Sequence, residues 1–253
     1  MERWVGRVAV VTGSSAGIGA AIAEELVKLG LQVVGIARRV ERVVELATKL
    51  KSEKGKLHPL KCDVSLENDV REAFEWIKTN LGGVDILINN AGVAKYSNLI
   101  DGPYENWKAI LDLNVLGLSL CTSEALAIMK ENGVDDGHII HINSAVGHSL
   151  PNFPNMTYMY AASKHAVTVL AEGLRRELLS QNSKIRITSV SPASTATEFR
   201  VASGRPLDPQ RSYSNSPHLL PKDVADSVVF ALSAPPHVQL HEMLIHPRSK
   251  NVQ

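Results

Sequence analysis

The residues that decide the fold are Val8-Ala-Val-Val-Thr-Gly-Ser-Ser-Ala-Gly-Ile-Gly19. The first five are β-branched or small and almost wholly apolar, which is typical of a short strand buried on both faces of a sheet. Behind the glycines, apolar residues recur at the spacing of one helix face: Ile18, Ile22, Leu26 and Leu29. Gly30 ends this pattern. The sequence therefore predicts a strand, a glycine-rich turn and a helix in direct succession.

Strand-like and helix-like segments alternate from this turn to the end of the chain. The later strand-like segments are 33–37, 57–63, 84–89, 138–143, 185–190 and 243–245. Helical periodicity covers 40–50, about 70–81, about 104–131, about 157–180 and about 222–233. Repeated β-α-β units with apolar strands predict an α/β fold: one Rossmann-type, doubly wound domain over 1–253, with about seven parallel strands and helices on both faces. The long irregular stretch at about 193–221 is predicted to be a substrate loop.

Composition excludes several classes of protein. Lys and Arg number 27 against 26 Asp and Glu, a net charge of +1, whereas nucleic-acid binding calls for a strongly basic face. The two cysteines, Cys62 and Cys121, form neither a disulfide framework nor a metal-ligand pattern, so we expect no metal. No apolar run reaches the ~18 residues of a membrane span, and no signal-peptide segment precedes the first strand. We expect a cytoplasmic protein with no membrane span and no nucleic-acid partner.

The glycine-rich turn is suited to phosphate. Glycines allow the backbone to approach a pyrophosphate, and the following helix offers free N–H groups and a partial positive charge. The spacing G-x-x-x-G-x-G is by itself also compatible with an ordinary tight turn. At the end of the second strand, where an acid would bind the ribose of NAD, the chain has Ala37-Arg38-Arg39. A charge-assisted bond of ~1.5–3 kcal/mol would favour NADP(H), unless the two arginines are merely solvated.

Tyr160 and Lys164 lie four residues apart on a predicted helix, so their side chains share a face. An ammonium at about 4 Å and an effective dielectric constant near 20 contributes ~4 kcal/mol, roughly three pKa units, which would make the phenol a usable acid and base. Such pairs also occur by chance. Asn143-Ser144 and Asn89–Gly92 follow predicted strands at the edge where ligands bind. Asn114 interrupts an apolar helical stretch and is either functional or a satisfied helix kink.

Together these features resemble the short-chain dehydrogenase/reductase family over essentially the whole chain. The matching residues are the glycine-rich turn, Asp63-Val64, Asn89-Asn90-Ala91-Gly92, Asn114, Ser144, Tyr160-x-x-x-Lys164 and Pro192. Met1–Trp4, Val134–His138 and Val146–His148 resemble one branch of the family, which includes farnesol dehydrogenases. The chain departs from the family pattern at Ala193, where a glycine is usual.

The resemblance implies a role for each of these residues. Tyr160 would exchange a proton with the substrate, Ser144 would bind the substrate oxygen, Lys164 would lower the Tyr160 pKa and hold the nicotinamide ribose, and Asn114 would anchor a water. The implied contacts of NADP(H) are Gly13, Ser15, Gly17, Ile18, Gly19, Arg38, Arg39, Asp63, Val64, Asn90, Ala91, Gly92, Tyr160, Lys164, Pro192, Thr195 and Thr197. His148 is either a pocket residue or a surface histidine.

The resemblance predicts an NADP(H)-dependent oxidoreductase that interconverts a lipophilic alcohol and its aldehyde or ketone. The substrate would be a terpenoid such as farnesol, or a hydroxysteroid or ketosteroid. A homodimer or homotetramer is also implied. One alternative is a protein that keeps the fold as a non-catalytic NADP(H) sensor or scaffold. A second, a nucleotide-sugar epimerase, would need a longer substrate domain than 253 residues allow.

Overall fold

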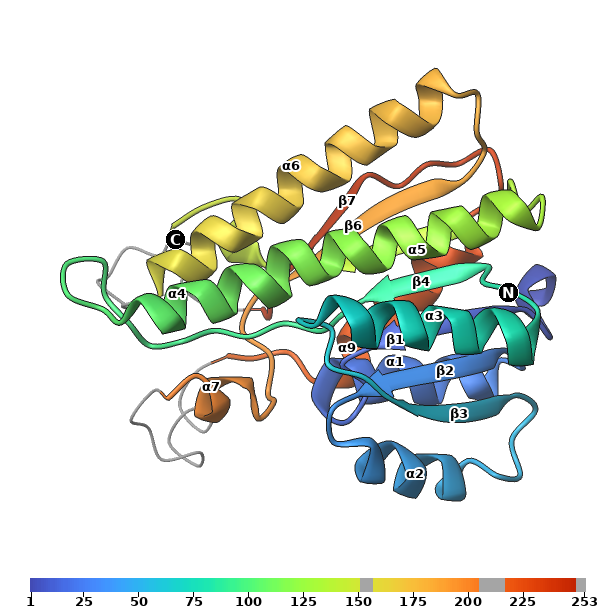
Figure 1. The fold of residues 1–253 in the computed structure, drawn as a ribbon, viewed down its shortest axis with the longest axis horizontal. Helices are drawn as coiled ribbons and strands as arrows, with labels where there is room; N and C mark the ends of the chain where they lie inside the picture. Colours follow the sequence, from blue (N-terminus) through green and yellow to red (C-terminus); the bar gives the residue numbers. More distant parts are fainter. Residues whose placement is uncertain (151–156, 205–216, 249–253) are drawn as a thin grey trace.

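One sheet of seven parallel strands runs through the computed structural model, which describes residues 1–150, 157–204 and 217–248 (Figure 1). The strands are β1 (Val8–Thr12), β2 (Gln32–Ala37), β3 (Lys56–Lys61), β4 (Ile86–Asn89), β5 (His138–Ile142), β6 (Arg186–Pro192) and β7 (Glu242–Ile245). Their order in space is β3-β2-β1-β4-β5-β6-β7. The predicted fold class and the number of strands are confirmed.

The strand order reverses beside β1. From β1 the chain builds outward through β2 to β3, then returns to place β4 on the other side of β1 and builds outward to β7. The connections leaving β1 and β4 therefore diverge at the carboxyl ends of the strands. In parallel sheets such a switch point opens a crevice in which ligands bind.

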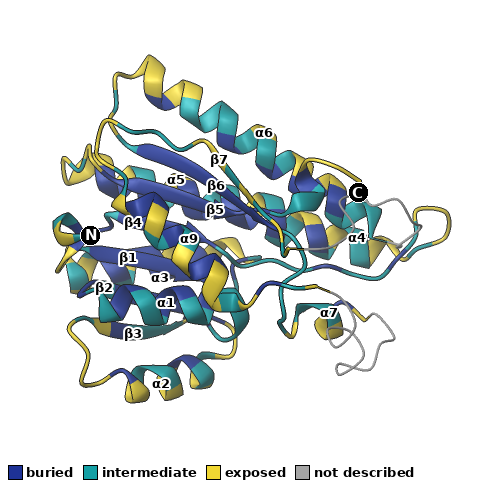
Figure 2. Ribbon diagram, turned by 180° about the vertical axis from the view of Figure 1, so that it is seen from behind, coloured by how far each residue is buried: buried dark blue, intermediate teal, exposed yellow. Residues whose placement is uncertain are grey.

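Helices cover both faces of the sheet. The longer helices are α1 (Gly17–Lys28), α2 (Val40–Lys49), α3 (Glu67–Leu81), α4 (Tyr104–Leu111), α5 (Leu118–Glu131), α6 (Tyr158–Ser180) and α9 (Pro221–Ser233). The short elements are η1 (Glu2–Trp4), η2 (Asp112–Gly117), η3 (Ala145–Gly147) and α7 (Phe199–Ala202). Helices α3, α5 and α6 lie over one face of the sheet (Figure 1), and α1 and α9 lie over the other (Figure 2).

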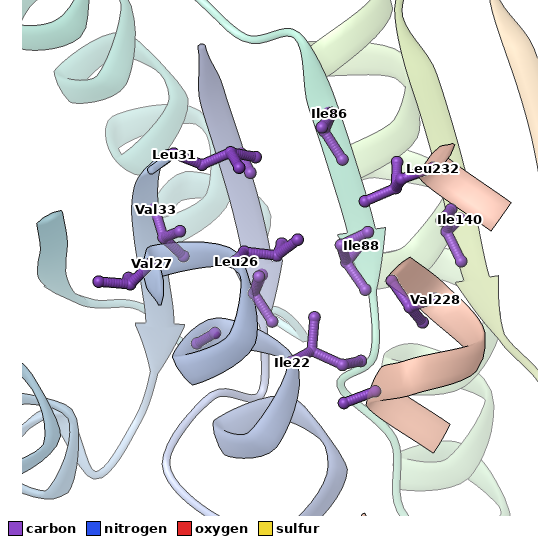
Figure 3. Packing of buried hydrophobic residues seen from close by; sticks show 14 of the residues in the cluster. Ile22, Leu26, Val27, Leu31, Val33, Ile86, Ile88, Ile140, Val228 and Leu232 are labelled. Atoms are coloured by element: carbon purple, nitrogen blue, oxygen red, sulfur yellow. The ribbon is translucent and has the colours of Figure 1, made fainter. Parts of the chain in front are cut away.

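Each layer has its own apolar core. On one face, Ile22 and Leu26 of α1 and Val228 of α9 pack with Ile88 of β4 and Ile140 of β5, all fully buried (Figure 3). The opposite core contains Phe74 and residues of the other strand faces. Because the central strands are buried on both sides, they are apolar at consecutive positions rather than at alternate ones.

One continuous helical run, 104–131, comprises α4, η2 and α5. It is the one helix among the described residues that is long and apolar enough to cross a membrane, by length and composition alone. Cys121, Ala125 and Met129 from this run pack into the core below the sheet. Part of this run therefore belongs to the core of the domain.

Candidate active site

A cleft of about 670 Å³ opens at the carboxyl ends of the strands, where the strand order reverses. Nearly all the predicted site residues line it: Gly13, Ser15, Gly17, Ile18, Arg38, Arg39, Asp63, Val64, Asn90, Ala91, Gly92, Ser144, Tyr160, Lys164, Pro192, Thr195 and Thr197. Gly19 and Asn114 do not line it, and neither does His148. The fold thus brings residues from six different strand ends to one site.

The glycine-rich turn forms a cradle that larger residues would fill. Gly13 and Gly17 have left-handed backbone conformations, with φ of +69° and +57°. A Cβ on Gly13 would lie 2.9 Å from the Cα of Ala91, and a Cβ on Gly17 would lie 3.0 Å from Cγ2 of Thr197. The N-terminus of α1, which opens into this cradle, has no side-chain cap. Its N–H groups are therefore available to an anion.

Asn90 ties the ends of β1 and β4 together. Its Nδ2 donates to the carbonyls of Thr12 (2.9 Å) and Gly13 (3.2 Å). In return, the Thr12 hydroxyl accepts from the backbone N–H groups of Asn90 and Ala91, both at 3.0 Å. Gly19 lies behind this clamp, where a Cβ would collide with Asn90 Nδ2 and the Gly13 carbonyl. Gly19 is therefore required for packing and does not reach the cleft.

The two predicted phosphate-binding arginines differ in their surroundings. The Arg38 side chain is 70% exposed, and its guanidinium lies 3.7 Å from the Asp63 carboxylate. Arg39 is paired at 3.2 Å with Glu198, a residue that sequence reasoning missed. Glu198 is 159 positions further along the chain, and no local signal in the sequence links the two residues.

Ser144, Tyr160 and Lys164 meet where β5 ends beside the first turns of α6. The Ser144 hydroxyl accepts from the backbone N–H of Val146 at 3.3 Å and hydrogen-bonds the phenol of Tyr160. Lys164 is buried, and its Nζ donates to the carbonyl of Ile142 at 2.8 Å. The same Nζ lies 6.0 Å from the centroid of the Tyr160 ring. This cluster supplies a phenol, a hydroxyl and an ammonium in one wall of the cleft.

The pKa of Tyr160 is set by its burial and by Ser144. Burial raises the pKa of the Tyr160 phenol to about 12, and the hydrogen bond with Ser144 opposes that rise only in part. Burial also lowers the pKa of the Lys164 ammonium to about 8. The ammonium of Lys164 is bound to the backbone carbonyl of Ile142. Burial and the Ser144 hydrogen bond, and not Lys164, therefore account for the pKa of the phenol in this arrangement.

Asn114 lies in η2, a π-helical segment within the 104–131 run. Its Oδ1 accepts from the N–H of Val93 at 2.8 Å, and its Nδ2 donates to the carbonyl of Val93 at 2.9 Å and to Ser163 Oγ at 3.0 Å. The Ser163 hydroxyl in turn donates to the carbonyl of Tyr160 at 2.7 Å. The side chain thus matches the alternative of a satisfied polar group in a distorted helix. It joins Val93, which lines the cleft, to the turn that carries Tyr160.

The segment after β6 also lines the cleft. The ring of Phe199, at the start of α7, lies 5.5 Å from the ring of Tyr160 at an interplanar angle of 55°. Arg200 donates to the Ser194 hydroxyl at 2.7 Å. Ala193, the departure from the family pattern, lines the cleft and donates its backbone N–H to Ile245 of β7 at 2.8 Å. Residues 205–216 of the predicted substrate loop lie outside the described residues.

His148 points toward the outer strands of the sheet. Its Nε2 lies 3.1 Å from Ser191 Oγ and 3.4 Å from Glu242 Oε1. The sequence left open whether His148 is a pocket residue or a surface histidine. This placement does not support a pocket residue, because His148 does not line the cleft. Both neighbours contact the same ring nitrogen, so the three residues do not form the relay of a hydrolytic triad, in which the acid and the nucleophile contact different nitrogens.

Comparison with known proteins gives a consistent result. A family model described as short chain dehydrogenase matches residues 7–207. Dehydrogenase/reductase SDR family member 11 of Bos taurus is 47% identical over 252 residues, covering 98% of both chains. Farnesol dehydrogenase of Aedes aegypti is 46% identical over 250 residues, again with 98% of both chains covered. The branch that the sequence predicted is therefore confirmed.

Solved structures agree in fold. An alcohol dehydrogenase from the archaeon Thermococcus sibiricus, complexed with 5-hydroxy-NADP, superposes with a TM-score of 0.84 at 25% identity. The match covers 98% of this chain and 99% of that one.

Proposed function

Because the chain belongs to the short-chain dehydrogenase family and is an oxidoreductase, we propose that it interconverts a lipophilic alcohol and its aldehyde or ketone with NADP(H). The observation that carries this proposal is the meeting of Ser144, Tyr160 and Lys164 in the cleft that also holds the glycine-rich cradle. A phenol, a hydroxyl and an ammonium beside an anion-binding helix end are what carbonyl chemistry with a phosphate-bearing cofactor requires.

The residues present fit a dinucleotide. Gly13 and Gly17 line the cleft without a side chain, and the uncapped end of α1 supplies N–H donors. Arg38 and Arg39 at the end of β2 would face the adenosine ribose and its 2′-phosphate, and Asp63 and Val64 would border the adenine. Asn90 to Gly92 would line the adenosine side, whereas Pro192, Thr195 and Thr197 would face the nicotinamide. The related archaeal alcohol dehydrogenase holds an NADP derivative in a fold with the same topology.

Each catalytic side chain would have a distinct task. When bound, the nicotinamide supplies or accepts the hydride. Tyr160 donates a proton from its phenol to the carbonyl oxygen, and its high pKa keeps the proton in place at neutral pH. Ser144 donates a hydrogen bond to the same oxygen and so fixes its position. Lys164 would hold the nicotinamide ribose, and Asn114 holds the Val93 segment and the first turn of α6 in register.

An apolar wall supports a lipophilic substrate. Phe199, Val93, Ala94 and Val146 surround the approach to Tyr160. A terpenoid alcohol such as farnesol fits this chemistry, as the name of the mosquito relative suggests, and a hydroxysteroid or ketosteroid fits it as well. We propose the stretch at about 193–221 as the substrate loop, because its described part already contributes Phe199 to this wall.

The test is NADPH consumption by the purified protein with farnesal and a panel of small ketosteroids. Tyr160→Phe removes the acid but keeps the ring against Phe199, so turnover should fall at least a hundredfold while NADPH still binds. Tight NADPH binding without turnover of any carbonyl would instead favour the alternative of a non-catalytic sensor. Full activity of Tyr160→Phe would show that the proton comes from another group.

The proposal extends to assembly and location. Leu116 of η2, Val169 of α6 and Phe230 of α9 are large apolar side chains more than 60% exposed, which supports a homodimer or homotetramer formed through these helices. Light scattering of the purified protein tests this. A cytoplasmic location agrees with Cys62 and Cys121, which are both free and buried, and cell fractionation tests it.

A further inference from the structure

Glu198 lies inside the corner of the cleft where the cofactor phosphate is proposed to bind. Its carboxylate accepts from Arg39 at 3.2 Å and from Arg42 at 2.9 and 3.0 Å. Arg39 and Glu198 both line the cleft, although they come from segments 159 positions apart in the chain. Among the described residues, Glu198 is thus the only acid paired with Arg39 and Arg42.

The ion pairs lie near the surface but are well formed. The side chains of Arg39, Arg42 and Glu198 are 48%, 40% and 56% exposed. The hydrogen bonds from Arg42 and then Arg39 hold the pKa of Glu198 below its usual range, so the carboxylate is ionised at neutral pH. Partly exposed pairs of this kind exchange their partners readily, because each contributes little to stability. A dianionic phosphate is a stronger ligand for a guanidinium than a single carboxylate.

Glu198 is also the middle residue of a strap, Thr197–Phe199, that crosses the cleft. Thr197 lies against the Gly17 position of the cradle, and Phe199 lies against the ring of Tyr160. Three consecutive residues therefore reach the glycine-rich turn, the arginine corner and the catalytic phenol. This placement is what lets a residue from beyond β6 act at the end of β2.

We propose that Glu198 is a determinant of cofactor specificity that competes with the 2′-phosphate of NADP(H) for Arg39 and so weakens the preference for NADP(H) over NAD(H). The inference rests on the proposed function, in which the 2′-phosphate binds beside Arg38 and Arg39. The 2′-phosphate binds the Arg39 guanidinium in place of the Glu198 carboxylate, and the two negative groups repel each other. NAD(H) carries no phosphate at this position and leaves the ion pairs intact.

The experiment compares wild type with Glu198→Gln, which keeps the side-chain size and removes the charge. Dissociation constants for NADPH and NADH are measured by titration of cofactor fluorescence. We expect Glu198→Gln to bind NADPH three- to tenfold more tightly, and NADH within twofold of wild type. The matched control is Glu41→Gln, because Glu41 is an exposed acid at the start of α2 that forms no ion pair in the described part of the chain. Glu41→Gln should leave the dissociation constants for NADPH and NADH within twofold of wild type.

Two further arms separate mechanism from side effects. The fragment 2′,5′-ADP carries the phosphate without the nicotinamide, so Glu198→Gln should tighten its binding and leave that of ADP unchanged. In an Arg39→Gln background, the gain from Glu198→Gln should shrink to less than twofold, because the shared guanidinium is gone. Retention of the full gain in that background would show that Glu198 does not act through Arg39, and would overturn the proposal.

The outcomes distinguish this inference from the proposed function. If wild type prefers NADPH but Glu198→Gln leaves the preference unchanged or lowers it, the inference is wrong and the proposed cofactor stands. If wild type binds both cofactors equally and Glu198→Gln prefers NADPH, the proposed preference is wrong and the competition by Glu198 is supported. If neither protein discriminates, both are wrong.

Discussion

Replacement of Lys164 by methionine should make the protein more stable at neutral pH and should remove a pH dependence of its stability. Lys164 is 5% exposed, and burial lowers its pKa from 10.5 to about 8. The unfolded chain therefore binds more protons than the folded chain between pH 8 and 10.5. Stability rises with pH wherever the unfolded state binds more protons. The lysine thus destabilises the fold most below pH 8, and this cost falls as pH rises toward 10.5.

The magnitude follows from the two pKa values. With 1.36 kcal/mol per pKa unit, the cost of the buried ammonium is about 3 kcal/mol at pH 7 and about 1 kcal/mol at pH 10. Urea denaturation of both proteins at a series of pH values measures this difference. The unfolding free energy of wild type minus that of Lys164→Met should rise by about 2 kcal/mol from pH 7 to pH 10. The same difference for the exposed control Lys130→Met should not change with pH. A flat or falling curve for Lys164→Met would refute the assignment of a desolvated cation.

Three other outcomes are expected. Asn114→Leu leaves the half-buried N–H and carbonyl of Val93 without their partner, so urea denaturation should show a loss of about 2–4 kcal/mol in unfolding free energy. An unchanged midpoint would contradict the clamp. Gly13→Ala forces a Cβ into a left-handed position 2.9 Å from Ala91, so calorimetry should show NADPH binding weakened at least tenfold, and wild-type affinity would mean that the turn relaxes at no cost. Phe199→Ala removes the apolar wall beside Tyr160, so KM for farnesal should rise about tenfold, with less effect on a small ketone; an equal effect on both would place the ring outside the substrate site.

Much of the fold was predictable because its signals are local. Strands β1 and β2 are apolar at consecutive positions, and the helix after the glycine-rich turn repeats its apolar residues every three or four positions. The predicted boundaries differ from the observed ones by only a few residues. The spacing of four residues likewise predicted that Tyr160 and Lys164 share one face of α6.

The electrostatics of the site were not predictable in this way. Whether Lys164 approaches the phenol depends on which acceptor holds its ammonium, and that acceptor, the Ile142 carbonyl, comes from a different element. The pairing of Arg39 with Glu198 likewise depends on how the segment after β6 crosses the cleft. The clamp formed by Asn114 is a third case, because its partner, Val93, lies 21 positions earlier. In each case a contact between distant segments decides the outcome.

The reversal of strand order beside β1 also has a consequence for biosynthesis. While the ribosome is still making the second half of the chain, β4 can already pair with β1. Its other neighbour, β5, begins only at His138, which is 49 positions after Asn89 at the end of β4 and beyond the long 104–131 helix.

 Until β5 is added, Ile86, Leu87 and Ile88 present an unpaired apolar edge to other nascent chains. The Thr197–Phe199 strap emerges later still, so a partly synthesised chain has no complete cofactor site and gains no stability from ligand binding. We therefore expect chaperones to bind the nascent chain at the β4 edge. The cofactor should stabilise only the finished protein.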